Sequence, residues 1–188
     1  MKKIAIIVCL TFLVPAAAGA ANPLFLFSIA GNYMRPADAA YRSIYGNQVL
    51  YAEFDAGVHI YRGIHILGSY GRLSKSGTTP ELELESHSMQ QFISVGVGYI
   101  RQISGLLNIE VEGGLVGAKY REEALDAVVS GQRPGIRAGL GLLFMAEEGK
   151  IFAGAKFVYI SAKVPDPEIR LGGAQATLCV GLRLFGGD

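Results

Sequence analysis

The sequence predicts an all-β fold, an eight-stranded antiparallel up-and-down barrel that crosses a membrane. Three observations lead to this prediction. Eight segments alternate apolar and polar residues with a period of two, so each strand would have one apolar and one polar face. Long and short connections alternate between these segments, and a leader typical of secreted proteins precedes them.

The leader covers residues 1–20. Lys2 and Lys3 form a positive start, residues 4–14 are mostly apolar, and Ala18-Gly19-Ala20 is a small-residue cleavage motif. The apolar run has about half of the ~20 residues that a transmembrane helix needs. We therefore expect a signal peptide over residues 1–20 and one barrel domain over residues 21–188.

We expect strands at residues 24–35, 48–61, 64–74, 88–101, 106–120, 134–145, 150–161 and 171–185. The second strand shows the alternation most clearly, because its even positions are all apolar: Leu50, Ala52, Phe54, Ala56, Val58 and Ile60. The other strands are placed by apolar or aromatic residues on one face and by glycines and charges on the other. Taken strand by strand along the chain, the residues that place the other seven strands are Phe25, Phe27 and Tyr33; Tyr70; Gly96, Gly98 and Tyr99; Glu110, Glu112 and Gly114; Arg137, Gly139, Gly141 and Phe144; Gly154, Lys156 and Tyr159; and Leu178, Val180, Gly181 and Leu182.

The connections are expected to differ at the two ends of the barrel. Tight turns are predicted at residues 62–63, 102–105 and 146–149, and longer polar loops at 36–47, 75–87, 121–133 and 162–170. In outer-membrane barrels the short turns face the periplasm and the long loops face outside. We expect one helical turn within residues 122–129. Leu82 and Leu84 alternate with glutamates, so the hairpin around residues 75–87 is predicted to extend past the membrane.

The apolar face is expected to meet lipid, and the polar face to line the lumen. Aromatic residues lie near the ends of the apolar face, where such rings settle at a membrane interface. Arg72 and Lys119 share that face, but they lie at the outer rim, where a charge costs only ~0–1 kcal/mol. The alternative is a soluble lipocalin-like carrier with its apolar face inward.

Charged residues on the polar face are predicted to form a lumen charge network. Eight strands enclose an interior just wide enough for side chains to fill it, and an unpaired buried charge costs several kcal/mol. We therefore expect a polar, side-chain-filled lumen, with a narrow small-solute pore as the alternative. The predicted network comprises Glu53, Asp55, Glu110, Glu112, Arg137, Lys156 and Arg183.

One short motif could support catalysis. Glu85-Ser86-His87-Ser88 contains the residue types of a Ser–His–acid hydrolase, which makes a lipid A-modifying enzyme a further alternative. His87 and its neighbouring serines would point to opposite faces of a regular strand, so we assign no catalytic residue. His59 and His65 offer only two metal ligands, and we expect no metal and no cofactor. A net charge of +1 without a basic block argues against nucleic acid as a partner.

Two segments resemble a known family. Ala30-Gly31-Asn32-Tyr33-Met34-Arg35-Pro36, followed by Ile44-Tyr45-Gly46, resembles the first strand and loop of the small bacterial outer-membrane β-barrel family, the OmpA/OmpX-like group. Gly181-Leu182-Arg183-Leu184-Phe185 is similar to the aromatic-terminated last strand of that family. In the family the aromatic residue is usually the last one, whereas Gly186-Gly187-Asp188 follow Phe185 here.

The resemblance implies a location in the bacterial outer membrane, with lipid and the outer-membrane assembly machinery as partners and Phe185 as the insertion signal. We also expect a monomer. We therefore expect a non-enzymatic outer-membrane barrel with a role in envelope structure or surface interaction.

Overall fold

The computed structural model confirms the predicted fold. Eight antiparallel strands form one closed barrel in chain order, and the last strand pairs with the first. The structure describes residues 24–80, 83–125, 127–145, 150–165 and 168–185, so the expected signal peptide at 1–20 and the turn at 146–149 lie outside the described residues. The elements are β1 Leu24–Pro36, α2 Ala39–Tyr45, β2 Val49–Tyr61, β3 Ile64–Thr78, β4 Glu85–Ser104, β5 Leu107–Ala124, β6 Ala127–Met145, β7 Ile151–Pro165 and β8 Glu168–Phe185.

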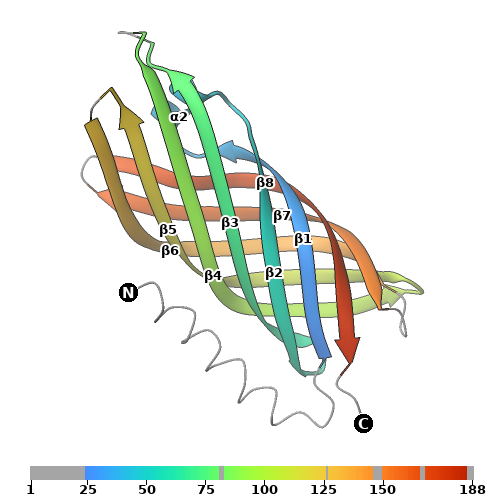
Figure 1. The fold of residues 1–188 in the computed structure, drawn as a ribbon. Helices are drawn as coiled ribbons and strands as arrows, with labels where there is room; N and C mark the ends of the chain where they lie inside the picture. Colours follow the sequence, from blue (N-terminus) through green and yellow to red (C-terminus); the bar gives the residue numbers. More distant parts are fainter. Residues whose placement is uncertain (1–23, 81–82, 126, 146–149, 166–167, 186–188) are drawn as a thin grey trace.

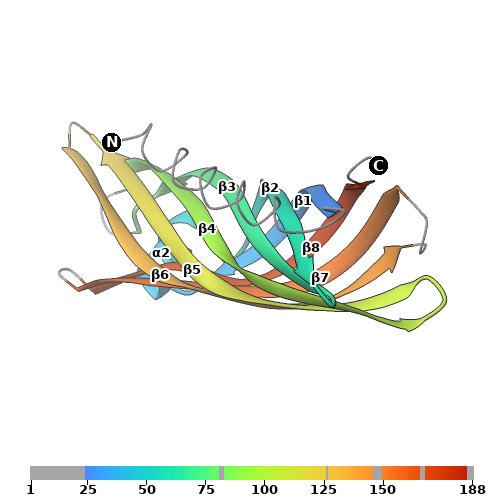
Figure 2. The ribbon, with the colours of Figure 1, turned by 90° about the horizontal axis from the view of Figure 1, so that it is seen from below.

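The strands run obliquely around the barrel (Figures 1 and 2). The stagger of the strands can be followed through their register partners. Starting at Phe27 on β1 and moving each time to the paired residue of the next strand leads to Gly172 on β8. The path returns to the first strand's side at Ala37, the residue that directly follows β1, whose N–H donates to the Gly172 carbonyl at 2.9 Å. The return point therefore lies ten residues beyond the start, from position 27 to position 37. For eight strands, this stagger corresponds to a tilt of about 40° and to an interior that side chains can fill.

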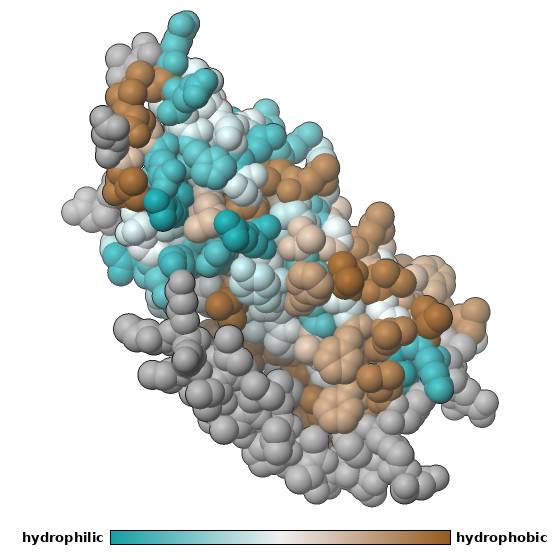
Figure 3. Space-filling view, in the orientation of Figure 1, coloured by the Kyte–Doolittle hydropathy of each residue, from teal (hydrophilic) through white to brown (hydrophobic). Residues whose placement is uncertain are grey.

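The outer surface of the barrel carries an apolar belt. Leu115, Phe157 and Leu178 are 67%, 60% and 71% exposed on it. Among the described strands, no charged side chain faces outward between the aromatic residues of the two rims. Figure 3 shows apolar side chains over the lower part of the visible face and polar ones over the upper part. An exposed apolar band of this extent is expected to lie in hydrocarbon. Among the described residues, no helix is both long and apolar enough to cross a membrane.

The connections at the outer end contain more regular structure than a plain loop. A loop was expected at residues 121–133, but β5 and β6 extend into this segment and pair as far as Ala124 and Ala127. The helical turn expected at 122–129 is therefore wrong. The β3–β4 hairpin extends to the pair Thr78 and Glu85, as predicted. Within residues 36–47 the chain forms α2, a short helix that the sequence analysis did not place. Its N-cap is Asp38, whose Oδ1 accepts from the Tyr41 N–H at 2.8 Å.

A glycine pair in the lumen permits close contact between β4 and β5. Gly96 and Gly114 are register partners, and a Cβ on Gly114 would lie 2.4 Å from the Val95 carbonyl oxygen and 2.6 Å from the Gly96 Cα. Gly113, the next residue, faces outward, and the nearest atom to its added Cβ lies at 4.0 Å. The two neighbours therefore differ sharply in the space around them.

We expect Gly114→Val to prevent closure of the barrel, because the backbone atoms that the new side chain meets cannot move aside. Gly113→Val, the matched control, should fold, because valine suits a lipid-facing strand. Heat-modifiable gel migration of the refolded protein measures this difference. Equal migration of the two variants would contradict the expectation.

Candidate functional site

The lumen is divided into three layers. The layer toward α2 is apolar and includes Met34, Leu73, Phe92, Ile160 and Val164, all at most 1% exposed. The layer toward the opposite end is a second apolar cluster: Leu26, Ala30, Ile100, Leu143, Phe152 and Cys179. Six of the seven predicted charged residues lie between them, so the ion pairs seen in the lumen among the described residues are confined to the middle layer.

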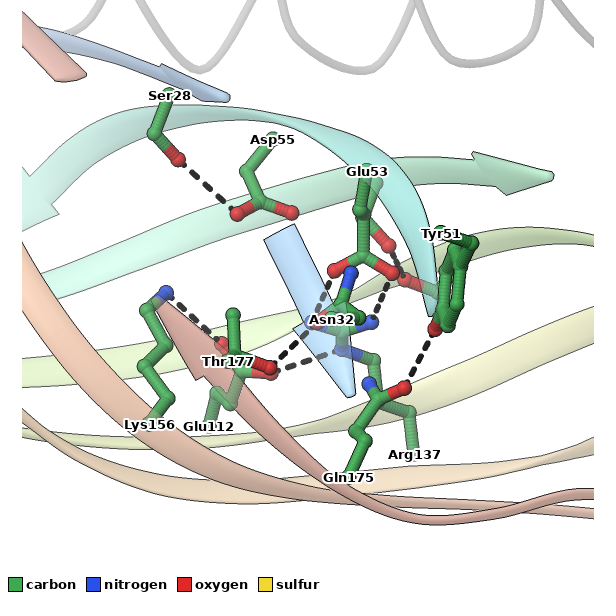
Figure 4. A network of polar contacts seen from close by, with 12 residues as sticks. Ser28, Asn32, Tyr51, Glu53, Asp55, Glu112, Arg137, Lys156, Gln175 and Thr177 are labelled. Atoms are coloured by element: carbon green, nitrogen blue, oxygen red, sulfur yellow. Dashed lines mark hydrogen bonds and ion pairs between the residues drawn. The ribbon is translucent and has the colours of Figure 1, made fainter. Parts of the chain in front are cut away.

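Arg137 is at the centre of the charged layer and comes from β6 (Figure 4). Its guanidinium donates to both carboxylate oxygens of Glu53 on β2, at 3.0 and 2.8 Å, and from Nε to Glu112 on β5 at 2.8 Å. Because β2 and β6 are four strands apart in a ring of eight, the Arg137–Glu53 pair spans the lumen. Glu53 is 0% and Arg137 7% exposed, so the pair is held away from water.

Lys156 on β7 forms the second half of the network. Its Nζ lies 2.8 Å from Glu110 Oε2 and 3.5 Å from Glu112 Oε2, so Glu112 joins the two cations. Asp55 accepts a hydrogen bond from Ser28 Oγ at 3.0 Å. The structure therefore brings six of the seven predicted residues into one layer. Cavities of about 30 and 20 Å³ adjoin Asp55, each with room for about one water molecule.

Neutral polar residues complete this layer, and none of them was among the predicted site residues. Tyr51 OH donates to Gln175 Oε1, and Thr177 Oγ1 donates to Asn32 Oδ1, both at 2.5 Å. All four residues are buried and lie on the polar face of their strands. Their strand parity could have identified them as lumen residues, but their pairing depends on positions as far apart as 32 and 177.

The seventh predicted residue, Arg183, lies apart from this layer. It lines a cavity of about 190 Å³ at the inner mouth together with His59 and His65. The imidazole centroids are 5.0 Å apart. His59 Nε2 accepts from the Gly63 N–H at 3.2 Å, and His65 Nδ1 lies 2.8 Å from the Gly63 oxygen, so the turn backbone positions both rings. Among the described residues, no group of three His, Cys, Asp or Glu side chains could hold a metal.

Phe185 ends β8 and pairs with Leu24 at the inner end of β1. Its role as an insertion signal stays a prediction.

The outer mouth is covered by α2. Tyr41 and Tyr45 are buried beneath the helix with their ring centroids 4.5 Å apart, and the Tyr45 hydroxyl hydrogen-bonds to Ser86. Burial raises the pKa of Tyr41 to about 12. A Cβ on Gly77 would meet the Ile44 carbonyl, so the helix also covers the adjoining edge of β3.

Beyond the belt, β3, β4, β5 and β6 continue as a four-stranded sheet (Figure 1). Pairing between β6 and β7 begins only at Gly135 and Ala162. The preceding residues of β6, 127–134, therefore pair with β5 on one side, and no other described strand lies on the other side. Val128 and Val129 are 54% and 53% exposed there, one on each face. We call residues 127–134 the free edge.

The structure does not assemble the suspected hydrolase motif. Ser86 and Ser88 are buried on the inner face, whereas His87 faces outward. Instead, Ser74 Oγ and Ser76 Oγ on β3 lie 3.0 and 3.1 Å from the two ring nitrogens of His87.

Comparison with known proteins identifies the class of fold. No protein-family model and no curated protein matches the sequence. Among solved structures, one similar protein is Ail, the attachment invasion locus protein of Yersinia pestis, whose crystal structure is in complex with the heparin analogue sucrose octasulfate. It is 12% identical to this chain, with a TM-score of 0.60, and the match covers 86% of this chain and 99% of Ail. Neisserial surface protein A is 11% identical with a TM-score of 0.57, covering 85% and 96%. The N-terminal β-barrel domain of Pseudomonas aeruginosa OprF is 16% identical with a TM-score of 0.54, covering 86% and 97%.

The chain thus has the fold of the small eight-stranded outer-membrane barrels. At these identities, the likeness concerns the fold alone.

Proposed function

We propose that this chain is a non-enzymatic integral protein of the bacterial outer membrane that presents a sheet outside the cell to a partner protein. The observation that carries the proposal is the free edge, which projects past the apolar belt. An edge strand offers a row of backbone N–H and C=O groups, and an extended polypeptide can pair with them. The attachment role in the name of Ail accords with such a surface.

Two features of the free edge favour strand addition. Residues 127–131 contain neither proline nor charge, the usual means by which an edge is protected from pairing. The exposed valines, one on each face, would pack against two consecutive side chains of an added strand. The opposite edge of the same sheet, β3, is covered by α2. The partner chemistry is therefore an extended segment with two consecutive apolar residues, one for each face of the sheet.

The lumen supports this function better than a pore. The ion pairs of the charged layer lie between two apolar clusters, and the cavities beside Asp55 hold about one water molecule each.

The proposal is tested by cysteine labelling of intact cells. Ser130→Cys on the free edge should react with a membrane-impermeant maleimide, because the proposal places this strand outside the cell. Ser104→Cys, at an inner turn, should react only after the cells are permeabilised. Both serines are exposed, and Cys179 is buried, so the unsubstituted chain gives a low background. Labelling of Ser104→Cys but not Ser130→Cys in intact cells would reverse the topology and refute the proposal.

A second arm of this experiment tests strand addition. A synthetic eight-residue peptide with two consecutive valines at its centre, the partner chemistry inferred above, should slow the labelling of Ser130→Cys. The same peptide with proline at alternate positions cannot complete a ladder and should have no effect. If both peptides leave the labelling rate unchanged at millimolar concentration, the free edge does not accept a strand.

A further inference from the structure

A row of polar side chains crosses four neighbouring strands just outside the apolar belt. Register pairs connect Arg72 on β3 to Gln91 on β4, Gln91 to Lys119 on β5, and Lys119 to Gln132 on β6. All four residues lie on the outward face; Gln91 is half-buried, and the others are exposed. We call these four residues the donor row.

The donor row lies where the apolar surface ends. Two residues toward the membrane from Arg72 and Gln91 are Tyr70 and Ile93, which are 42% and 48% exposed on the same face. The apolar belt therefore adjoins the row directly. A lipid whose acyl chains pack against Tyr70 and Ile93 would place its headgroup at the donor row.

The charge of this region is positive. The next register row outward consists of Ser74, Met89, Arg121 and Ser130, which adds a third cation. In neither row do the described residues include an outward carboxylate. The first one, Glu123, lies one row further out and contacts Arg121. Arg72 and Lys119 therefore have no outward-facing anion beside them in their own row or the next.

The spacing and chemistry of the donor row define its ligand. Neighbouring strands are about 4.8 Å apart, so Arg72 and Lys119 start roughly 10 Å apart with an amide between them. Cations bind phosphate oxygens, and glutamine amides both donate to and accept from sugar hydroxyls. We propose that the donor row binds the headgroup of a phosphorylated glycolipid whose acyl chains lie on the belt. This site shares Gln132 with the free edge, but both of its cations lie on β3 and β5, so it does not depend on strand addition.

The test measures lipid retention by native mass spectrometry. The refolded protein in detergent is mixed with equal amounts of a bisphosphorylated lipid A and a phosphatidylcholine. We expect selective retention of lipid A, reduced about tenfold or more in the double variant Arg72→Gln/Lys119→Gln, because each cation near such a surface contributes about 1 kcal/mol. The matched control is Arg101→Gln/Lys150→Gln, which removes one exposed arginine and one exposed lysine at the inner end and should retain lipid A unchanged.

Two further measurements keep the proposal falsifiable. Salt at 0.5 M should weaken retention by the unsubstituted chain, because the contact is electrostatic. Inorganic phosphate at 10 mM should not displace the lipid, because the acyl chains also bind. Equal losses in the two double variants, or full displacement by inorganic phosphate, would overturn the proposal. Heat-modifiable migration shows that each variant is folded, and the labelling of Ser130→Cys reports on the free edge independently.

Discussion

Replacement of Arg137 by methionine is expected to lower the free energy of unfolding of the refolded barrel by about 3–5 kcal/mol. The guanidinium is the only hydrogen-bonding partner seen for the Glu53 carboxylate among the described residues, and it also binds Glu112. Methionine fills much of the same space, so the loss comes mainly from two buried carboxylates left without their cation. Urea unfolding in lipid vesicles, followed by tyrosine fluorescence, measures the change.

Two controls separate this effect from a general loss of charge. Arg121→Met breaks the exposed Arg121–Glu123 pair and should cost less than about 1 kcal/mol. The double variant Arg137→Met/Glu53→Gln should regain part of the stability, because the neutral amide no longer needs a cation. If Arg137→Met is no more destabilising than Arg121→Met, the buried pair does not hold the barrel together.

Lys156→Met is expected to have the second largest effect, a loss of about 3 kcal/mol. Its Nζ is the cation beside Glu110, at 2.8 Å, whereas Glu112 keeps Arg137 when the lysine is removed. One carboxylate is therefore stranded instead of two, and the loss should be smaller than for Arg137→Met. The shift of the thermal transition of the refolded barrel measures it.

A double-mutant cycle with Glu110→Gln tests the cause of this loss. Lys156→Met/Glu110→Gln should be more stable than Lys156→Met alone, because the residue left beside the methionine is then neutral. A melting temperature unchanged by Lys156→Met, or a double variant less stable than both single ones, would refute the pairing of these residues.

The strands could be predicted because the alternation of apolar and polar residues within each segment is enough to identify it as a strand. Alternation with a period of two fixes which residues share a face, and the cost of a charge in hydrocarbon fixes which face is outward. Glu53, Glu112 and Arg137 could therefore be placed in the lumen from the sequence alone. Their partners could not, because the stagger of ten residues decides which positions on β2, β5 and β6 reach the same depth.

The part of the barrel beyond the outer rim was predicted less well because long-range pairing overrides local preference there. Residues 122–129 contain glutamate, alanine and leucine, which favour a helix, yet the β5–β6 ladder continues through them. Leu125 allows the reversal with a φ of +52°. The signals for α2 were present in Asp38 and Gly46, which cap its two ends, but seven residues are too few to show a helical period.

The apolar clusters above and below the ion pairs have a consequence for the membrane that houses this protein. Under the proposed function, each copy would add an extracellular sheet to the cell surface, and the apolar layers on either side would keep ions from the charged middle layer. Under the same proposal, many copies would cover the cell exterior while other proteins control its permeability.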